Sequence, residues 1–368
     1  MKIDKTNNFN EVTFDDVLLL PGKSDFLVDN EKKNIKITGR IAKDFYLDLP
    51  IVSAPMPGVT GEKMAITIGK AGGLGFIHPF QSINSQAEQI TRVKKENVKV
   101  AGTISFNKST TLKDVSILLQ AGADLISLET GQAHNTQTIE FISKIKNAFK
   151  DIKVSASLVV TQQATKELIK AGADSIRVGI GGGSHCTTRL VTGVGRPQLS
   201  AVEDCYQIAK KYDIPIISDT GIKYSGDIPK AFAFGAEAVM IGGLLSGTDE
   251  CPGEIIEKDG KKYKYSWGMC TDTAYKHQTP WEQLNPIEIL RKIKRSIFNN
   301  QKLNKEFEEG VEALVPYKGS ANMVLSQLKG GLIRSMWYLG TKNIKEIEKN
   351  AKVVLVSNST HLENIPRI

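Results

Sequence analysis

The sequence lacks the features that mark a membrane, secreted or disulfide-stabilised protein. Its 368 residues include only four cysteines, which form no CxxC pair and have no regular spacing. This pattern argues against a zinc site or a disulfide framework and favours a reducing, cytoplasmic compartment. No apolar run approaches the ~20 residues that a membrane span requires. The first ten residues, MKIDKTNNFN, contain no apolar segment of a signal peptide.

Charge of one sign is only slightly in excess. Lys and Arg number 48 against 40 Asp and Glu, so the formal net charge is +8. A Lys-rich solvated surface accounts for this excess, which is weak evidence for an anionic partner. One basic helix is predicted over Pro286–Glu306. A solvated helix face explains it better than nucleic-acid binding, so we expect no nucleic-acid partner and no membrane partner.

Short apolar runs alternate with amphipathic helical stretches along most of the chain. The runs are nearly continuous in apolar character, as expected for parallel strands that helices cover on both faces. Eight strands are predicted: Pro50–Ser53, Leu74–His78, Val98–Ser105, Asp124–Glu129, Lys153–Val160, Ser175–Ile180, Pro215–Asp219 and Ala238–Gly243.

A small internal repeat supports a barrel. Four segments, Lys70–Leu74, Gln120–Asp124, Lys170–Asp174 and Ala233–Glu237, place a glycine between a helical stretch and an apolar run. Such a glycine supplies the left-handed residue that ends a helix. No GxGxxG follows the first strand, which lowers the case for a dinucleotide-binding open sheet. We therefore predict an α/β fold: one (β/α)8 barrel over residues 1–368, with a flap insertion at 244–319 and a final helix near Ala321–Leu328.

The loop after the sixth strand is the richest candidate site. It reads Gly179-Ile-Gly-Gly-Gly-Ser-His-Cys-Thr-Thr-Arg189. Its glycines allow close approach of a ligand, and successive backbone N–H groups can bind an anion. Ser184 adds a hydroxyl donor, and Cys186 is the best nucleophile candidate of the chain. Thr188 and Arg189 are close enough to assist proton transfer and charge balance.

At this loop the sequence resembles the IMP dehydrogenase/GMP reductase family. The motif continues with Thr192-Gly-Val-Gly195, and further matches occur in the family's order along nearly the whole chain. They include Val12–Pro21, Ser53–Met56, Gly72–His78, Ile217–Gly221, Met240–Gly243, Gly268-Met269 and Glu309–Gly319. The resemblance implies an NAD(P)-dependent oxidoreductase in which Cys186 attacks C2 of a purine nucleotide. It also implies a homotetramer of barrels.

The resemblance assigns roles residue by residue. The catalytic set is Cys186, Thr188 and Asp272. The substrate-binding set is Ser184, Gly221, Gly242, Gly243 and Tyr265 for the phosphate, Asp219 for the ribose, and Gly268, Met269 and Glu309 for the base. On the cofactor side, Glu129 and His134 are candidates for the nicotinamide, with Arg189 beside them. A potassium ion is expected at the carbonyl groups of Gly181, Gly183 and Cys186.

Two reactions are open to such a chain, and they need different helpers. The dehydrogenase of the family must hydrolyse its adduct and uses an Arg-Tyr pair in its flap, which residues 271–309 lack. The reductase needs an acid near a leaving amine, and Asp272 and Thr188 match that need. Lys94–Val98 also runs straight into the next strand, so the paired regulatory module of many dehydrogenases is not expected. GMP reductase with NADPH is therefore predicted; IMP dehydrogenase with NAD is the alternative.

Several departures from the family pattern keep other hypotheses open. Glu129-Thr-Gly-Gln, Ser157-Leu-Val-Val and Asp219-Thr-Gly221 replace the usual segments, and Asp272 is one methylene shorter than the family's Glu. These changes allow a modified purine or deazapurine nucleotide as substrate. A nucleotide-binding protein with reduced catalysis is a further hypothesis, against which the retained Cys186 argues.

Overall fold

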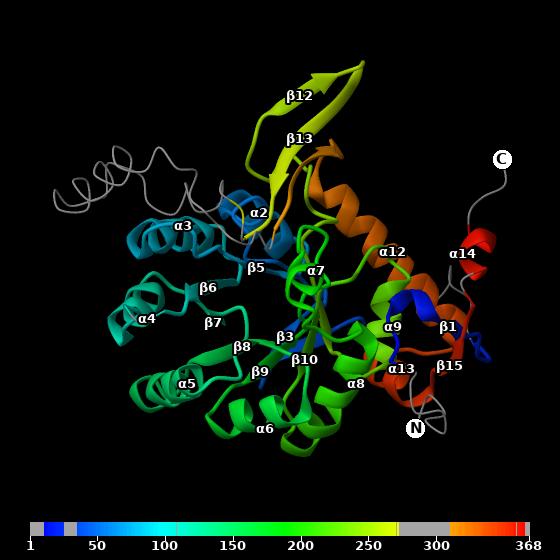
Figure 1. Cartoon of the computed structure of the whole chain (residues 1–368), viewed down its shortest axis with the longest axis horizontal. Helices are drawn as coiled ribbons and strands as arrows, with labels where there is room; N and C mark the ends of the chain where they lie inside the picture. Colours follow the sequence, from blue (N-terminus) through cyan, green and yellow to red (C-terminus); the bar gives the residue numbers. More distant parts are fainter. Residues whose placement is uncertain are drawn as a thin grey trace.

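The computed structural model describes residues 11–25, 35–107, 109–269, 271, 310–357 and 359–364. Within these residues, eight parallel strands close into a barrel in the order β10-β11-β4-β5-β6-β7-β8-β9 (Figure 1). The strands are β4 (Ile51–Ser53), β5 (Leu74–Phe76), β6 (Val100–Ser105), β7 (Leu125–Glu129), β8 (Lys153–Val159), β9 (Ser175–Val178), β10 (Ile216–Asp219) and β11 (Ala238–Ile241). Each lies inside a predicted run, so the (β/α)8 prediction is confirmed.

Helices cover the outside of the barrel between successive strands (Figure 1). They are α2 (Glu62–Lys70), α3 (Ile83–Lys95), α4 (Leu112–Gln120), α5 (Thr136–Ala148), α6 (Gln162–Lys170), α8 (Gln198–Ala209), α9 (Asp227–Ala233), α12 (Ala321–Leu339) and α13 (Ile344–Asn350). The short α7 (Thr188–Thr192) has no buried residue and lies instead in the loop after β9. The predicted final helix corresponds to α12, which is longer than its pattern indicated and is not the last, because α13 and α14 (Thr360–Glu363) follow it. Only four residues separate the end of α3 from β6, so no further module lies there.

The glycines of the repeat have the backbone geometry that their positions predicted. Gly72, Gly122, Gly172 and Gly235 have φ angles of 93°, 100°, 107° and 105°. A side chain at such an angle would be strained, so glycine lets each helix end and turn at once toward the next strand. These short joints keep the strands in register around the barrel.

The barrel interior is a packed apolar core that is closed at one end by a hairpin. Inward-facing residues such as Phe76 and Met240 belong to one buried cluster with Ile41, Phe45 and Leu47. These last three residues come from the antiparallel pair β2 (Gly39–Ala42) and β3 (Phe45–Leu47). The hairpin covers the amino-terminal ends of the strands, so ligand access is left to the opposite, carboxyl end.

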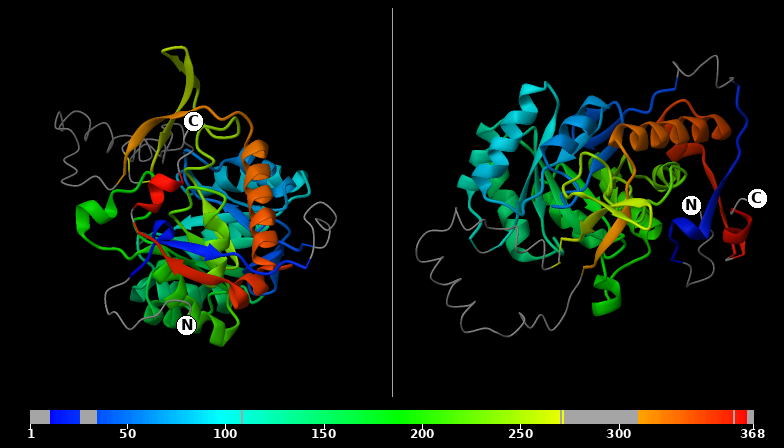
Figure 2. Two further views of the ribbon diagram at one scale, coloured as in Figure 1. Left: turned by 90° about the vertical axis from the view of Figure 1, so that its right-hand side faces the viewer. Right: turned by 90° about the horizontal axis from the view of Figure 1, so that it is seen from above.

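Two smaller sheets lie outside the barrel. Near the start of the chain, η1 (Phe14–Asp16) leads into β1 (Val17–Leu20), which pairs antiparallel with β15 (Lys352–Leu355), as Figure 2 shows. The second sheet is formed by β12 (Ile255–Lys258), β13 (Lys261–Trp267) and β14 (Glu312–Pro316), and its hairpin projects from the body (Figure 1). It belongs to the predicted insertion at 244–319. The basic helix predicted over Pro286–Glu306 lies outside the described residues. Of the described helices, none is long and apolar enough to cross a membrane.

Candidate active site

The predicted functional side chains gather at the carboxyl ends of the barrel strands. Glu129 ends β7, Asp219 ends β10, and the glycine-rich loop follows β9. Gly242 and Gly243 follow β11 in the same way. Because parallel strands point their carboxyl ends to one face, residues that lie far apart in the sequence meet there.

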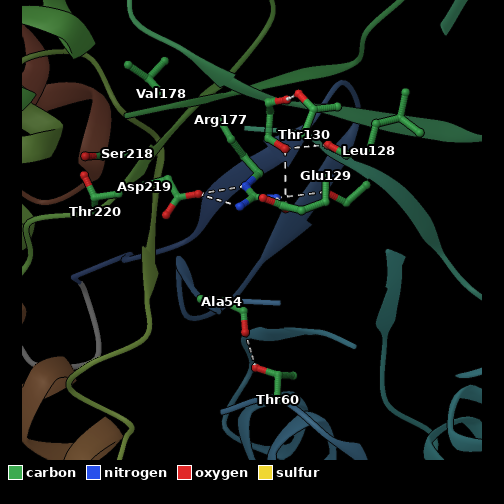
Figure 3. A network of polar contacts seen from close by, with 12 residues as sticks. Ala54, Thr60, Leu128, Glu129, Thr130, Arg177, Val178, Ser218, Asp219 and Thr220 are labelled. Carbon is green, nitrogen blue, oxygen red and sulfur yellow. Dashed lines mark hydrogen bonds and ion pairs between the residues drawn. The ribbon is translucent and has the colours of Figure 1, made fainter. Parts of the chain in front are cut away.

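A buried arginine joins two of the predicted carboxylates. Arg177, on β9, donates from Nε and Nη2 to Asp219 Oδ2 at 3.0 and 2.6 Å, and from Nη1 to Glu129 Oε2 at 2.5 Å. Nη1 also reaches the Ser127 hydroxyl at 3.1 Å. Figure 3 shows the guanidinium between the two carboxylates. The candidate ribose ligand and the candidate cofactor residue therefore share one cation.

Two buried carboxyl groups share one cation in this cluster. Burial raises the pKa of Glu129, and the neighbouring Asp219 charge raises it further, while Arg177 opposes both. The same two carboxylates raise the pKa of Arg177 and keep its guanidinium charged. Among the described residues, Arg177 is the one cation that contacts the two carboxyl groups, so the cluster favours a ligand that brings hydrogen-bond donors to this end of the barrel.

The candidate nucleophile lies beside the candidate proton donor. The Cys186 thiol donates to Thr188 Oγ1 at 3.1 Å, and the Cys186 N–H donates to the Gly183 carbonyl at 3.1 Å. Cys186 is half-buried, in contrast to Cys205 and Cys251, which are buried. Cys186 also forms an isolated antiparallel bridge with Gly310. The chain just after Glu309 is thus held against the cysteine loop.

Ser184 and Gly243 form a cradle at the mouth of the barrel. A Cβ on Gly243 would come within 2.3 Å of Ser184 Oγ, so only glycine leaves the hydroxyl in place. Lys318 Nζ donates to the carbonyls of Gly243 and Leu244 at 3.0 and 2.9 Å. Gly242 lies against Met56 Sδ, which a Cβ would approach to 2.9 Å. A hydroxyl group, a glycine backbone that a ligand can approach closely and a nearby cation together suit a phosphate group.

His185 joins this cradle to the hairpin. Its Nδ1 lies 3.1 Å from Ser184 Oγ, and its Nε2 lies 3.0 Å from Ser266 Oγ on β13. Its carbonyl accepts from the N–H of Val311 at 3.0 Å. Burial lowers the pKa of His185, and the charge of Lys318 lowers it further. The ring is therefore a neutral imidazole with one donor and one acceptor.

Tyr265 and Met269 are placed around a different aromatic cluster. Tyr265 and Trp267 stack in a tilted geometry with centroids 5.7 Å apart, and Met269 packs with them against Phe80. Tyr265 Oη donates to the Glu312 carboxylate. Since side chains alternate along a strand, Tyr265 and Ser266 are on opposite faces of β13. Ser266, rather than Tyr265, lies on the side of His185 and Ser184.

A cavity of about 630 Å³ opens next to this aromatic cluster. Its walls include Phe80, Tyr265 and Trp267, together with His78 from the loop after β5. Flat aromatic faces of this kind can stack on a planar ring. The structure thus offers a second place, beside Met269, where a heterocycle can bind.

Two predicted cofactor residues face partners of their own. The Arg189 guanidinium donates to the carbonyls of Ile180 and Arg196 at 2.8 and 2.5 Å, and so it holds the loop backbone. His134 Nε2 lies 3.1 Å from Glu167 Oε2 on α6. Neither contact joins them to the cluster around Arg177. Their assignment to the cofactor stays a prediction.

The segment Asp219-Thr-Gly221 adopts an unusual backbone. Thr220 has φ of 97°, an angle that β-branched residues avoid. Its hydroxyl donates to Gln198 Oε1 at 3.1 Å, and Gln198 Nε2 donates to the Asp219 carbonyl at 3.1 Å. Gly221 also has positive φ, 82°, and packs against Phe14. Gln198 thereby holds the strand end that carries Asp219.

Two predicted site residues, Asp272 and Glu309, lie outside the described residues. Their neighbours are described: Thr271 donates to the Gly268 carbonyl at 2.9 Å, and Gly268 packs closely against His185. Gly268 and Gly310, which precede and follow these undescribed residues, both lie against the cysteine loop. The roles of Asp272 and Glu309 stay predictions.

Sequence reasoning missed Arg177, His185 and Lys318. Arg177 had a usable signal, because a lone arginine in an apolar strand must find carboxylate partners when buried. His185 lies in the glycine-rich loop, but the family pattern assigned it no role. Lys318 lies in the matched segment Glu309–Gly319, but its link to Gly243 could not be read from the sequence, because that link depends on how the chain after β14 folds back.

The predicted potassium site would consist of backbone oxygens. Within the described part of the chain, no group of three or more His, Cys, Asp or Glu could hold a metal ion. The Gly183 carbonyl accepts one hydrogen bond, from Cys186, and keeps a second lone pair. Carbonyl oxygens are the donors that hard cations prefer. The Gly183 carbonyl is thus able to join such a site, and the assignment of Gly181, Gly183 and Cys186 to potassium stays a prediction.

The fold and site define a class: a (β/α)8-barrel enzyme with an accessible cysteine and an anion cradle in the loop after its sixth strand. The model of the "IMP dehydrogenase / GMP reductase domain" family matches residues 11–367, and the chain belongs to this family. It is an NAD(P)-dependent oxidoreductase of that family, whose members act on purine nucleotides.

Curated relatives resemble the chain over its whole length. An "Inosine-5'-monophosphate dehydrogenase" of Borreliella burgdorferi is 35% identical over 406 residues, covering 96% of each chain. One of the same name from Cryptosporidium parvum is 35% identical over 391 residues, 95% of this chain and 92% of the relative. One from Aquifex aeolicus is 32% identical over 480 residues, 96% of this chain and 94% of the relative. That alignment is longer than the chain, so the Aquifex protein carries a segment that this chain lacks.

Proposed function

We propose that the chain reduces GMP to IMP with NADPH and releases ammonia, through a covalent adduct of the nucleotide on Cys186. The observation that carries this proposal is the contact between the Cys186 thiol and Thr188 Oγ1 at 3.1 Å. It places a hydroxyl at the sulfur that would attack the purine. A proton donor at this point is what a leaving amine needs.

Side chains of this protein can account for each step of the proposed reaction. Ser184, Gly243 and Lys318 hold the phosphate, and Asp219 accepts hydrogen bonds from the ribose while Arg177 keeps it oriented. The Cys186 sulfur attacks C2 and forms a C–S bond, while its proton passes to Thr188. The C2–N bond then breaks, and Thr188 with Asp272 passes that proton to the departing amine, which leaves as ammonia. A bound reduced nicotinamide would supply the hydride for C2; the C–S bond then breaks and Cys186 takes up a proton from solvent.

Binding of the nicotinamide cofactor fits the residues at the barrel mouth. The cluster of Glu129, Arg177 and Asp219 presents carboxyl oxygens, which can accept hydrogen bonds from a nicotinamide carboxamide. The aromatic cavity beside Met269 offers stacking faces. We place Glu129 and His134 on the cofactor side, potassium at Gly181, Gly183 and Cys186, and four copies of the chain in the working assembly. The insertion at 244–319 serves as the flap of the site.

IMP dehydrogenase is the second candidate, which the names of the curated relatives favour. Residues 271–309 contain no Arg-Tyr pair, which is the feature against it. A different flap residue, such as Lys276 or Arg291, would then have to activate water. A modified purine or deazapurine nucleotide is a third possibility for the substrate.

The test is a substrate matrix with purified protein. GMP, IMP, XMP and a deazapurine nucleotide are each incubated with NAD(H) and NADP(H), while reduced nicotinamide absorbance and ammonia are followed. GMP-dependent loss of NADPH with equal release of ammonia supports the reductase. IMP-dependent reduction of NAD, with no turnover of GMP, would overturn it in favour of the dehydrogenase.

A further inference from the structure

His185 occupies a place that the proposed chemistry does not use. It follows Ser184 and precedes Cys186, and its ring contacts Ser266 on β13. The residue is 7% exposed, and both ring nitrogens have hydroxyl neighbours at 3.0–3.1 Å. A buried imidazole with both nitrogens engaged is held in one orientation.

The two neighbours of the ring differ in what else they can do. Ser266 Oγ is buried, with the residue 1% exposed, and His185 is the partner that its side chain contacts. Ser184 is exposed at the mouth of the barrel, and its oxygen lies against Gly243. Lys318 adds a positive charge behind Gly243. Ser184 is thus the one hydroxyl of the pair that can meet a phosphate.

A hydroxyl can donate only one hydrogen, so the direction of the Ser184 proton matters. If Nδ1 of His185 accepts a hydrogen bond, the Ser184 hydroxyl donates its hydrogen to the ring. Only the lone pairs of Ser184 Oγ then face the phosphate. If Nδ1 carries the hydrogen, it donates to Ser184 Oγ, and the Ser184 proton is free for an anionic oxygen. Nε2 is then the acceptor for the Ser266 hydroxyl.

We propose that His185 is a positioning residue that orients the Ser184 hydroxyl toward the substrate phosphate. The relay runs from the Ser266 O–H to Nε2, from Nδ1–H to Ser184 Oγ, and from the Ser184 O–H to a phosphate oxygen. The tautomer is assigned here from this donor and acceptor logic. The relay also ties phosphate binding to β13, the strand that leads to Gly268 and Met269. The inference rests on the proposed function, in which Ser184 and Gly243 hold a nucleotide phosphate.

The experiment is a double-mutant cycle on binding rather than on turnover. IMP and inosine are titrated calorimetrically into the full-length protein without any nicotinamide, for the wild type, S184A, H185L and S184A/H185L. We expect H185L and S184A each to weaken IMP binding roughly tenfold. The double variant should be no weaker than S184A alone, because His185 acts through Ser184. Inosine, which lacks the phosphate, should bind every variant within about twofold of the wild type.

Two conservative variants, H185N and H185Q, keep the test valid if H185L does not fold. In H185N the amide nitrogen takes the place of Nδ1 and still donates to Ser184, so IMP affinity should stay within about threefold of the wild type. In H185Q the amide reaches toward Ser266 instead, and we expect a loss like that of H185L. Thermal unfolding of each variant separates a folding defect from a binding defect.

The outcomes are distinguishable. If the wild type binds neither IMP nor GMP, the proposed function fails. Two results would show that the relay is wrong and that His185 has only a structural role, even if the wild type binds IMP. One is a double variant whose fold loss of IMP affinity equals the product of the losses in S184A and H185L. The other is a loss of inosine affinity as large as the loss of IMP affinity. Equal losses in H185N and H185Q would overturn it as well.

Discussion

The hydroxyl oxygen of Ser184 lies 2.3 Å from the place that a Cβ atom would take on Gly243. Two loops that are almost sixty positions apart, one after β9 and one after β11, therefore touch at a point where no side chain but hydrogen fits. Lys318 holds the Gly243 carbonyl from behind. This contact shapes the cradle that we assign to the substrate phosphate.

Replacing Gly243 should disrupt that cradle. In Gly243→Ala, the new methyl group would force the Ser184 side chain to rotate away, and we expect IMP or GMP affinity to fall at least about tenfold. Calorimetric titration measures the change. Gly330→Ala is the matched control, because a Cβ there meets nothing within 4 Å. This control lies on α12 and should gain about 0.5–1 kcal/mol of stability with unchanged binding. Normal affinity in Gly243→Ala would contradict the cradle.

The cysteines should differ sharply in reactivity. Cys186 is half-buried, whereas burial raises the pKa of Cys205 to about 12. With iodoacetamide near pH 8, peptide mass spectrometry should show Cys186 modified, protected by nucleotide, and Cys205 intact. Cys186→Ala should abolish turnover and leave nucleotide binding measurable. Modification of Cys205 at the rate of Cys186, or turnover by Cys186→Ala, would remove the assigned role.

Glu129 should make stability depend on pH in a specific direction. Because burial raises its pKa in the folded state, folded protein holds the proton more tightly than the unfolded chain does. The stability that this group contributes is complete below about pH 4.5 and is lost as pH rises toward the raised value. Glu129→Gln mimics the protonated form and avoids that loss. Its stability relative to the wild type should rise by about 1.4 kcal/mol per pH unit across this window.

Urea unfolding of the two proteins at several pH values between 4.5 and 7.5 measures this difference. A constant difference across the whole range would show that Arg177 keeps Glu129 ionised throughout. We expect Glu129→Gln to fold like the wild type, because the glutamine side chain still donates and accepts hydrogen bonds at the same place.

At the closed end of the barrel, one ion pair should carry much of the stability of the hairpin. Arg40 on β2 donates from Nε and Nη2 to Glu237 at 2.8 and 2.6 Å, and from Nη1 to Asp213 at 2.9 Å. The Asp213 side chain is 77% exposed, whereas that of Glu237 is 16% exposed. Arg40→Met leaves the largely buried Glu237 carboxylate without its partner and should cost about 3 kcal/mol.

The control for that change is Asp213→Asn, which removes an exposed partner of the same arginine. We expect a cost of at most about 1 kcal/mol. Chemical denaturation measures both. Nucleotide affinity should be unchanged in Asp213→Asn, since this residue lies at the end of the barrel opposite the site. Equal costs for the two variants would contradict the dominant role of Glu237.

The sequence by itself determined the barrel and the position of the nucleophile. Buried parallel strands need continuous apolar runs, and glycines with positive φ end the helices before them; both signals are local, so each strand could be read from its own residues. The cysteine loop was visible for the same reason, because its glycines and Cys186 are contiguous.

Only the tertiary structure decided which polar groups share partners. Arg177 with Glu129 and Asp219, His185 with Ser266, Lys318 with Gly243, and β1 with β15 all join segments distant in the chain. The type of a side chain shows which kind of hydrogen-bond or ion-pair partner it requires when buried, but not which residue will be that partner. The closing of the barrel selects the partner, because it brings the strand ends together and removes the water that would otherwise form hydrogen bonds with these polar groups.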